Sequence, residues 1–313
     1  MSTEELIDAA RQQLEAWPMA ADNYRRLGEV RRHDMRYGDL TVATQFNPAR
    51  AVSTGAKVDA KTISERPCFL CDCNRPEQQT ILEHFCDWQV LLNPFPIFRT
   101  HFTIAHSRHQ HQDNIDFSDM AEFTLTHPGL LTFYNGSASG ASCPDHLHFQ
   151  ATLSTELQIC RYVEDAPGKL VAMIGTTRIY IVDDLPAVAL HIVSDGKSPL
   201  IQQWADALLK PNDYGIPDKS LRNLLMWTDE NGMLHTLLFP REKHRPECYT
   251  SEASDTTNGK HMVSPGAVDM ACLVVTPRLC DFESLDVYPL ARILSEVSYD
   301  FTSSEMLRNL LMR

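Results

Sequence analysis

The stretch that decides the fold reads FYNGSASGASCPDHLHFQA over residues 133–151. Near its end, His146, His148 and Gln150 alternate with Leu147 and Phe149. Successive side chains of a β-strand point to opposite faces, so the alternation predicts a strand at 146–152. That strand would bury its apolar face and present two imidazoles and an amide together on the other face. This arrangement predicts a functional site.

Glutamine at the third position limits the chemistry of this row. Its amide makes only neutral hydrogen bonds, whereas a third histidine would add a titratable group beside a leaving phosphate. We therefore expect a lasting covalent intermediate, in which His148 attacks a phosphorus atom and passes the nucleotidyl group to a second acceptor. Gln150 would hold a non-bridging phosphate oxygen as charge develops there. The alternative is a polar face of a surface strand.

A cysteine pair upstream predicts a metal site. Cys68 and Cys71 are separated by two residues in the loop-forming stretch RPCFLCDCNRP at 66–76, a spacing that supplies two thiolates of a tetrahedral zinc site. His109, at the end of a predicted strand, and His146 would complete a Cys2His2 set. Four protein ligands leave no open position for water, so the Zn²⁺ would be structural and would fix His146 two residues before the nucleophile. The alternatives are Cys73 in place of Cys71, and His101, His106 or His111 in place of His109.

With these motifs in place, the chain resembles the galactose-1-phosphate uridylyltransferase branch of the histidine-triad superfamily. That branch shares, in this order, the Cys-x-x-Cys pair, an Asn-x-Phe-x turn, a zinc-binding His and His-x-His-x-Gln. Asn135 lies eleven residues before His146, as in the family, and NPFP at 93–96 corresponds to the turn. The segment NPAR at 47–50 is similar to an early family segment whose Arg approaches phosphate.

A second group is similar over more of the motif. The plant GDP-L-galactose phosphorylases and the related animal GDP-glucose phosphorylases carry NHLHFQA, and this chain has DHLHFQA at 145–151. The likeness continues through LLFPREK at 237–243, SPGAVDM at 264–270 and ILSEVS at 293–298. The chain most resembles bacterial members of this branch that combine the cysteine knuckle with PDHLHFQ.

The resemblance implies roles for further residues. Asn93 and Phe95 would contact the nucleoside, and Arg50 and Asn135 would steady the diphosphate. Ser142 or Cys143 would bond the distal phosphate. Basic residues on the turn after an apolar strand, Arg241 and Lys243, would bind phosphate, since Arg grips it bidentately.

Bulk properties are those of a globular enzyme. The chain has 313 residues, 43% of them hydrophobic, and a formal net charge of −13. This charge argues against nucleic-acid binding, which needs clustered Lys and Arg. The amino terminus lacks an apolar signal region and no run approaches 18 apolar residues, so we expect a cytoplasmic protein that does not enter a membrane. The nine cysteines are expected to be reduced.

The pattern of apolar residues predicts an α+β fold with two histidine-triad-like lobes, each an antiparallel sheet with helices packed on it. Residues 1–38 would be a helical segment, 39–160 the catalytic lobe with the zinc knuckle, and 161–313 a degenerate second lobe. Its counterpart of the motif strand would be residues 269–273, which contain no histidine. One active site per chain is therefore expected, with His191 and His235 as core or surface residues.

The sequence thus predicts a nucleotidyltransferase or phosphorylase. Its substrate would be a nucleoside-diphosphate sugar (GDP- or UDP-hexose), with phosphate or a sugar 1-phosphate as acceptor. One alternative is a dinucleoside polyphosphate (Ap4A-type) phosphorylase or hydrolase; the other is a zinc-stabilised nucleotide-binding protein without turnover. The transferase relatives imply a homodimer.

Overall fold

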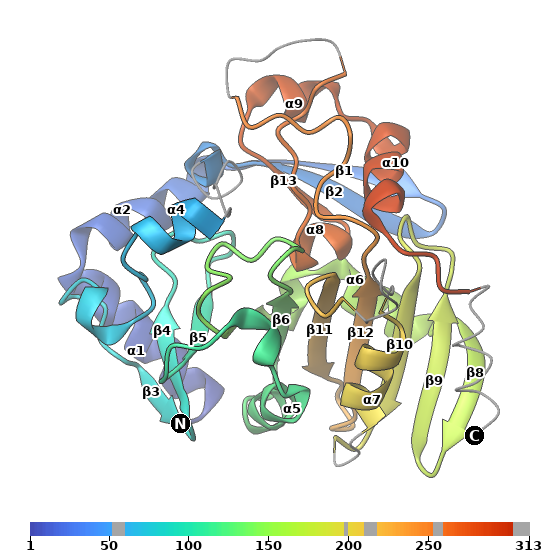
Figure 1. Ribbon diagram of the computed structural model, residues 1–313, viewed down its shortest axis with the longest axis horizontal. Helices are drawn as coiled ribbons and strands as arrows, with labels where there is room; N and C mark the ends of the chain where they lie inside the picture. Colours follow the sequence, from blue (N-terminus) through green and yellow to red (C-terminus); the bar gives the residue numbers. More distant parts are fainter. Residues whose placement is uncertain (52–59, 197–199, 210–217, 253–258, 303–313) are drawn as a thin grey trace.

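One large antiparallel sheet organises the molecule (Figure 1). The computed structural model describes residues 1–51, 60–196, 200–209, 218–252 and 259–302. In this part of the chain the large sheet has the order β3-β4-β5-β7-β6-β11-β12-β10-β9-β8, and a smaller sheet has the order β1-β2-β13. The strands are β1 Arg31–Tyr37, β2 Leu40–Phe46, β3 Glu83–Phe85, β4 Trp88–Leu92, β5 Phe102–His106, β6 Leu130–Asn135, β7 His148–Leu153, β8 Lys169–Ile174, β9 Thr177–Val182, β10 Ala189–Ser194, β11 Arg222–Thr228, β12 Leu234–Pro240 and β13 Leu273–Thr276.

The two halves of the large sheet repeat the same connectivity. The first half has the order β3-β4-β5-β7-β6 from its edge to the centre, and the second has β8-β9-β10-β12-β11. Antiparallel pairing of β6 with β11, including Phe133 opposite Leu225, joins them into one sheet. Helix α5 (Phe117–Thr126) precedes β6 as α7 (Leu200–Ala207) precedes β11. The prediction of two related lobes with antiparallel sheets and packed helices is confirmed.

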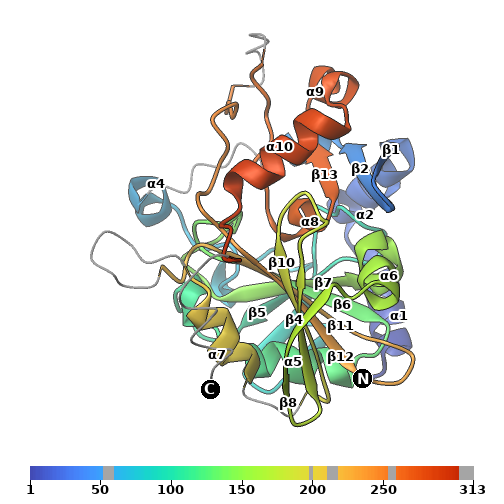
Figure 2. The same ribbon diagram turned by 90° about the vertical axis from the view of Figure 1, so that its right-hand side faces the viewer.

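Helices cover one face of the large sheet, and the small sheet lies over the other (Figure 2). Phe123 of α5, Trp204 of α7 and Leu6 of α1 (Thr3–Ala16) are buried in the core of the first face. The opposite core contains Phe133 and Leu225 of the large sheet, together with residues of the following elements: β2, β13, α6 (Gln158–Asp165), α8 (Ala267–Met270) and α10 (Val287–Val297). The motif strand lies between these layers.

Strand positions in the large sheet agree with the sequence pattern. The apolar runs of the sequence predict strands at 88–92, 101–105, 130–134, 178–182, 188–193, 222–228 and 233–239. At each end these ranges lie within one residue of β4, β5, β6, β9, β10, β11 and β12 respectively. The boundary predicted near residue 160 stays a prediction, and it falls within α6. The remaining helical segments are α2 Pro18–Arg26, α4 Ala60–Glu65, α9 Leu279–Ser284 and the 3-10 turns Leu27–Glu29, Pro48–Arg50, Asp72–Asn74, Gln112–Asn114 and Ser154–Glu156.

Two local predictions were wrong. The helical segment predicted over residues 1–38 ends earlier, at the 3-10 turn Leu27–Glu29, because β1 begins at Arg31 and pairs with β2 along its whole length. Residues 269–273 are not the second lobe's motif strand: they span the end of α8 and the start of β13, which pairs in parallel with β2. By connectivity the counterpart of β7 is β12, which carries His235 near its start.

His235 lies in the core and not in an open site. Its Nδ1 lies 3.0 Å from Nε2 of His191, and its ring stacks on Trp227 at a centroid distance of 5.3 Å. Both histidines are buried. The expectation that they are core residues therefore agrees with their placement. No helix among the described residues is long and apolar enough to cross a membrane.

Candidate active site and metal centre

The motif strand begins at His148, two residues later than predicted. His146 and Leu147 precede β7 and are held by contacts to carbonyl groups at the end of β5 and in the segment that follows it. The Leu147 N–H donates to the Gln110 carbonyl at 2.6 Å, and His146 Nε2 lies 2.8 Å from the His106 carbonyl. Because that carbonyl can only accept, the His146 proton sits on Nε2 and the Nδ1 lone pair is free to bind a metal.

Cys68, Cys71, His109 and His146 meet as the sequence predicted. Their four possible ligand atoms all lie within 4.8 Å of one another. His146 Nδ1 is 3.3 Å from Cys68 Sγ and 3.5 Å from Cys71 Sγ, and His109 Nδ1 is 3.3 Å from Cys71 Sγ. A tetrahedral zinc with its usual bond lengths separates sulfur and nitrogen ligands by about 3.5 Å. The cluster therefore has the dimensions needed to hold a metal ion.

The electrostatics of the two thiols also suit a cation. The hydrogen bond from the Cys143 thiol holds the pKa of Cys68 well below its usual range. Burial raises the pKa of Cys71. The pair thus carries one thiolate at neutral pH, and a bound divalent cation would displace the second proton.

The alternative ligands lie elsewhere. Cys73 is exposed, and His111 contacts Asp113 on the surface. His106 packs edge-on against Trp88, with its Nδ1 accepting from the Arg108 backbone N–H at 3.1 Å. His101 is fully buried against the motif strand, as described below.

The His148 ring is held in one orientation by a backbone carbonyl. Its Nδ1 lies 2.8 Å from the His146 carbonyl, so the ring proton sits on Nδ1 and the lone pair on Nε2. Burial lowers the pKa of His148 to about 4, and the imidazole is therefore neutral at pH 7. A neutral ring with a fixed lone pair needs no general base to attack phosphorus.

Gln150 is locked in one orientation by His101. The Ile97 N–H donates to His101 Nδ1 at 3.1 Å, so the His101 proton is on Nε2, which lies 2.9 Å from Gln150 Oε1. Burial, followed by the Arg50 charge, lowers the pKa of His101 to about 3, which keeps this ring neutral. Because the amide oxygen faces His101, the amide nitrogen of Gln150 is left to donate to a ligand.

The predicted nucleoside turn adjoins Gln150. Asn93 Nδ2 lies 3.0 Å from Thr103 Oγ1 and 3.4 Å from Gln150 Oε1, while Asn93 Oδ1 accepts from the Phe95 N–H at 2.9 Å. The Phe95 side chain is exposed, which leaves its ring open to an aromatic base. Arg50 Nη1 donates to the Phe95 carbonyl at 2.9 Å. The structure thus brings Arg50, Asn93 and Phe95 to one side of the motif strand.

Asn135 joins the two halves of the sheet beside His148. Its Oδ1 accepts from Asn223 Nδ2 at 2.8 Å and from the Ala267 N–H at 2.7 Å. The loop after it turns at Gly140, whose φ of +101° favours glycine and where a Cβ would lie 2.8 Å from Gly266 Cα. Asn135 thus ties the first lobe to the start of α8, and its amide nitrogen faces away from these two bonds.

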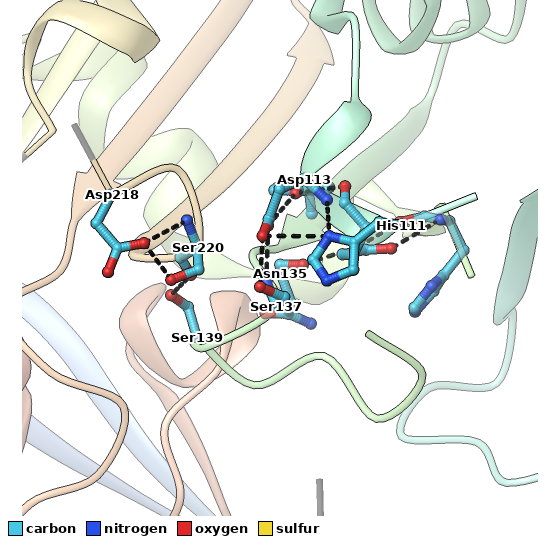
Figure 3. Close-up of polar contacts among 10 residues, drawn as sticks. His111, Asp113, Asn135, Ser137, Ser139, Asp218 and Ser220 are labelled. Carbon is cyan, nitrogen blue, oxygen red and sulfur yellow. Dashed lines mark hydrogen bonds and ion pairs between the residues drawn. The ribbon is translucent and has the colours of Figure 1, made fainter. Parts of the chain in front are cut away.

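Hydrogen bonds from both lobes hold the start of the loop that leads from Asn135 to the motif (Figure 3). Ser137 Oγ donates to Asp113 Oδ2 at 2.5 Å, and its N–H donates to Oδ1 at 3.1 Å. Ser139 Oγ donates to the Ser220 carbonyl at 2.6 Å. Residues from both lobes therefore hold this loop.

Three residues predicted to bind phosphate are placed differently. Arg241 is fully buried and all five of its N–H donors have acceptors, namely Val297 O, Asn223 Oδ1, Pro265 O, Lys243 O and His244 O. Lys243 pairs with Glu296 at 2.6 Å. Cys143 Sγ lies 3.8 Å from Cys68 Sγ, so this thiol lies beside the metal cluster. The prediction that Arg241 binds phosphate is therefore wrong, because none of its N–H donors is left for a substrate. Ser142 is exposed.

Two residues at this site are not predicted from the sequence. His101 was considered only as a metal ligand, although its position at the start of the strand beside the motif strand could have suggested a contact with Gln150. Gln112 is fully buried, and its side chain bonds to the backbone of His148 and Asn135. No pattern in the sequence distinguishes it from the polar residues around it.

Comparison with known proteins agrees with this fold. Residues 9–153 match the model of a domain of unknown function, DUF4922. No curated protein matches the chain in sequence. The crystal structure of yeast Ap4A phosphorylase Apa2 superposes with a TM-score of 0.62 at 13% identity, covering 94% of this chain and 97% of that one.

Two complexes of the same yeast enzyme also match. Its structure with AMP has a TM-score of 0.60 at 14% identity, covering 95% of this chain and 98% of that one. Its structure with Ap4A has a TM-score of 0.57 at 14% identity, covering 90% and 96%. The chain thus has the histidine-triad-like α+β fold of this phosphorylase over nearly its whole length.

Proposed function

We propose that this protein is a nucleotidyltransferase that works through a covalent nucleotidyl-His148 intermediate, and that it is a phosphorylase of dinucleoside polyphosphates of the Ap4A type. The observation that carries the proposal is the orientation of two groups on one strand face: the His148 Nε2 lone pair and the Gln150 amide nitrogen. The fold shared with an Ap4A phosphorylase supports this choice of substrate.

In the first step, His148 Nε2 would attack the α-phosphorus of the bound nucleotide. The bond from this phosphorus to its bridging oxygen breaks, and the remaining nucleoside polyphosphate leaves with the electron pair. Gln150 would donate to a non-bridging oxygen as its charge grows, a contact that is stronger in the transition state than in the ground state. The His146 carbonyl accepts from Nδ1–H and stabilises the ring as it becomes cationic.

In the second step, an oxygen of inorganic phosphate would attack the nucleotidyl phosphorus from the opposite side. The bond to Nε2 breaks, a nucleoside diphosphate leaves, and the neutral imidazole is regenerated. Gln150 cannot act as an acid or base, which favours an ionised phosphate acceptor over water.

The neighbouring residues would position the nucleotide. We propose that the exposed Phe95 ring contacts the base and that Asn93 contacts the sugar, while Arg50 and the Asn135 amide nitrogen bind the phosphates. Arg50 suits this role because its hydrogen bond to the Phe95 carbonyl fixes it beside the turn.

The metal held by the Cys2His2 set would be zinc with a structural role. Thiolate and imidazole ligands in a tetrahedral set favour Zn²⁺, and four protein ligands leave no site for substrate. It would fix His146, whose carbonyl in turn orients His148.

A nucleoside-diphosphate hexose is the second candidate substrate. The DHLHFQA motif at 145–151, which is similar to that of the GDP-hexose phosphorylases, favours it. Sugar 1-phosphate would then leave in the first step, and phosphate or another sugar 1-phosphate would be the acceptor. A cytoplasmic location and a homodimer remain predictions.

The test is the intact mass of the enzyme after incubation with Ap4A, GDP-, UDP- or ADP-sugars in the absence of acceptor. A gain of one nucleoside monophosphate, absent in His148→Ala and lost on adding phosphate, is expected, and the donor that gives it identifies the substrate class. A protein that binds these nucleotides without forming an adduct or releasing products would be a binding protein, and the proposal would be wrong.

A further inference from the structure

The backbone of His148 lacks a strand partner on one side. Its neighbour β5 pairs with it at Ala105, and the His106 N–H donates to the Leu147 carbonyl at 2.9 Å. In an antiparallel ladder this pattern turns the N–H and C=O of His148 away from β5, toward β6. The pairing of β6 with β7, however, ends at Phe133 opposite Gln150.

The side chain of Gln112 takes the place of the missing strand. Its Oε1 accepts from the His148 N–H at 2.9 Å, and its Nε2 donates to the His148 carbonyl at 2.8 Å. The second Nε2 proton goes to the Asn135 carbonyl, also at 2.8 Å. One amide thus satisfies both backbone groups of the nucleophile and links them to the end of β6.

Gln112 is itself held rigidly. It is fully buried; its N–H donates to the Pro144 carbonyl at 3.0 Å, and its carbonyl accepts from Tyr134 Oη at 2.9 Å. A fully bonded amide without solvent contact has a single orientation, since a flip would set its NH2 against the His148 N–H.

We infer that Gln112 is a positioning residue for nucleotidyl transfer, an inference that rests on the proposed function. The His148 ring bonds to the His146 carbonyl two residues earlier, so the direction of Nε2 depends on the backbone path from 146 to 148. The metal cluster fixes one end of this path and Gln112 fixes the other. Gln112 lets β6 and β7 diverge around the loop at 136–145 while His148 stays in register.

Two variants separate the effects of its bonds. Gln112→Glu keeps the size and the acceptor for the His148 N–H but replaces the donors with an oxygen facing two carbonyls. Gln112→Met removes all three bonds. Gln110→Met is the matched control, because the described contacts of Gln110 use its backbone carbonyl.

The experiment measures how the rate of nucleotidyl-enzyme formation depends on Ap4A concentration in the full-length, metal-loaded enzyme. The metal content of each variant is measured in parallel. A displacement of about 1 Å costs roughly 100-fold in rate, so we expect a loss of that order in both Gln112 variants. Half-saturation and metal content should stay within about two-fold, and Gln110→Met should match the wild type. A wild-type rate in Gln112→Met, or a parallel loss of rate, Ap4A affinity and metal in both variants, would overturn the inference.

A measurement without turnover keeps the two proposals distinguishable. If the wild type forms no adduct, the proposed function fails. Two measurements then test whether Gln112 positions His148: amide hydrogen exchange at His148 and the ¹⁵N signals of its imidazole. Faster exchange and shifted ring signals in Gln112→Met, with neither change in Gln110→Met, support positioning by Gln112. Unchanged exchange and ring signals refute it.

Discussion

Replacing His101 with Phe should slow nucleotidyl transfer although His101 never touches the reacting phosphorus in the proposed mechanism. The substitution keeps a buried ring but removes the hydrogen bonds to the Ile97 N–H at 3.1 Å and to Gln150 Oε1 at 2.9 Å. The Gln150 amide then keeps only the 3.4 Å contact from Asn93. Loss of one orienting hydrogen bond allows the flipped amide, and loss of a transition-state donor costs at most about 10² to 10³ in rate. We expect a roughly 10- to 100-fold slower formation of the nucleotidyl enzyme.

The stability cost needs its own control. Each bond removed leaves a buried partner unsatisfied, so the free energy of unfolding should fall by about 2–4 kcal/mol. His127→Phe is a matched variant: His127 is also fully buried and bonds to the Phe123 carbonyl at 3.0 Å and to Glu83 at 2.9 Å, on the opposite face of the sheet. Urea denaturation and single-turnover mass spectrometry on both variants separate the effects. Equal loss of rate in both, or a wild-type rate in His101→Phe, would refute the orienting role.

Three further predictions concern the metal, the buried arginine and pH. Cys71→Ala should lose the bound metal, whereas Cys73→Ala, at an exposed cysteine two residues away, should retain one metal ion per chain by elemental analysis; the reverse result would reassign the ligand. Arg241→Met should lower the free energy of unfolding by at least about 3 kcal/mol, because it leaves five acceptors without their donor, three of them buried. Arg241→Lys, with three donors, should restore only part of this stability; a change below about 1 kcal/mol in urea melts would contradict a stabilising role for these hydrogen bonds. Burial lowers the pKa of His191 to about 3, so the unfolded chain binds a proton that the folded one does not between about pH 6.5 and 3, and stability falls as the pH drops through this range. The loss between pH 7 and pH 5 should be about 2 kcal/mol smaller in His191→Phe, and an equal loss in both proteins would exclude a buried neutral His191.

The sequence predicted the parts of the site that depend on local pattern. The alternation from His146 to Gln150 predicts a strand face, and the two-residue spacing of Cys68 and Cys71 predicts a knuckle. Each pattern is contained within a few residues, and few structures other than a strand face or a metal-binding knuckle would explain it. His109 was added to this set because it lies at the end of a predicted strand. The structure places the ligand atoms of Cys68, Cys71, His109 and His146 together.

Long-range pairing is what local pattern could not reveal. Gln112 bonds to His148 and Asn135 across 36 and 23 positions, and nothing in its own segment marks it as buried. Arg241 lies on a basic surface-like turn, yet its acceptors come from segments up to 56 positions away. Residues 269–273 were assigned to a strand of the large sheet, whereas they end α8 and begin β13, whose partner β2 lies more than 220 positions earlier in the chain.

The parallel pairing of β2 with β13 has a consequence for the chain as it is synthesised. Thr276 Oγ1 donates to the Gln45 carbonyl across 231 positions, so β2 lacks its β13 partner until those 231 further residues have been synthesised. At roughly 5–20 residues per second this interval lasts about 10 to 50 seconds. During that time the buried side chains of β2 and its open edge are exposed to other chains. In the nascent molecule the hairpin of β1 and β2 is therefore a segment that must be protected from pairing with other chains until β13 is made.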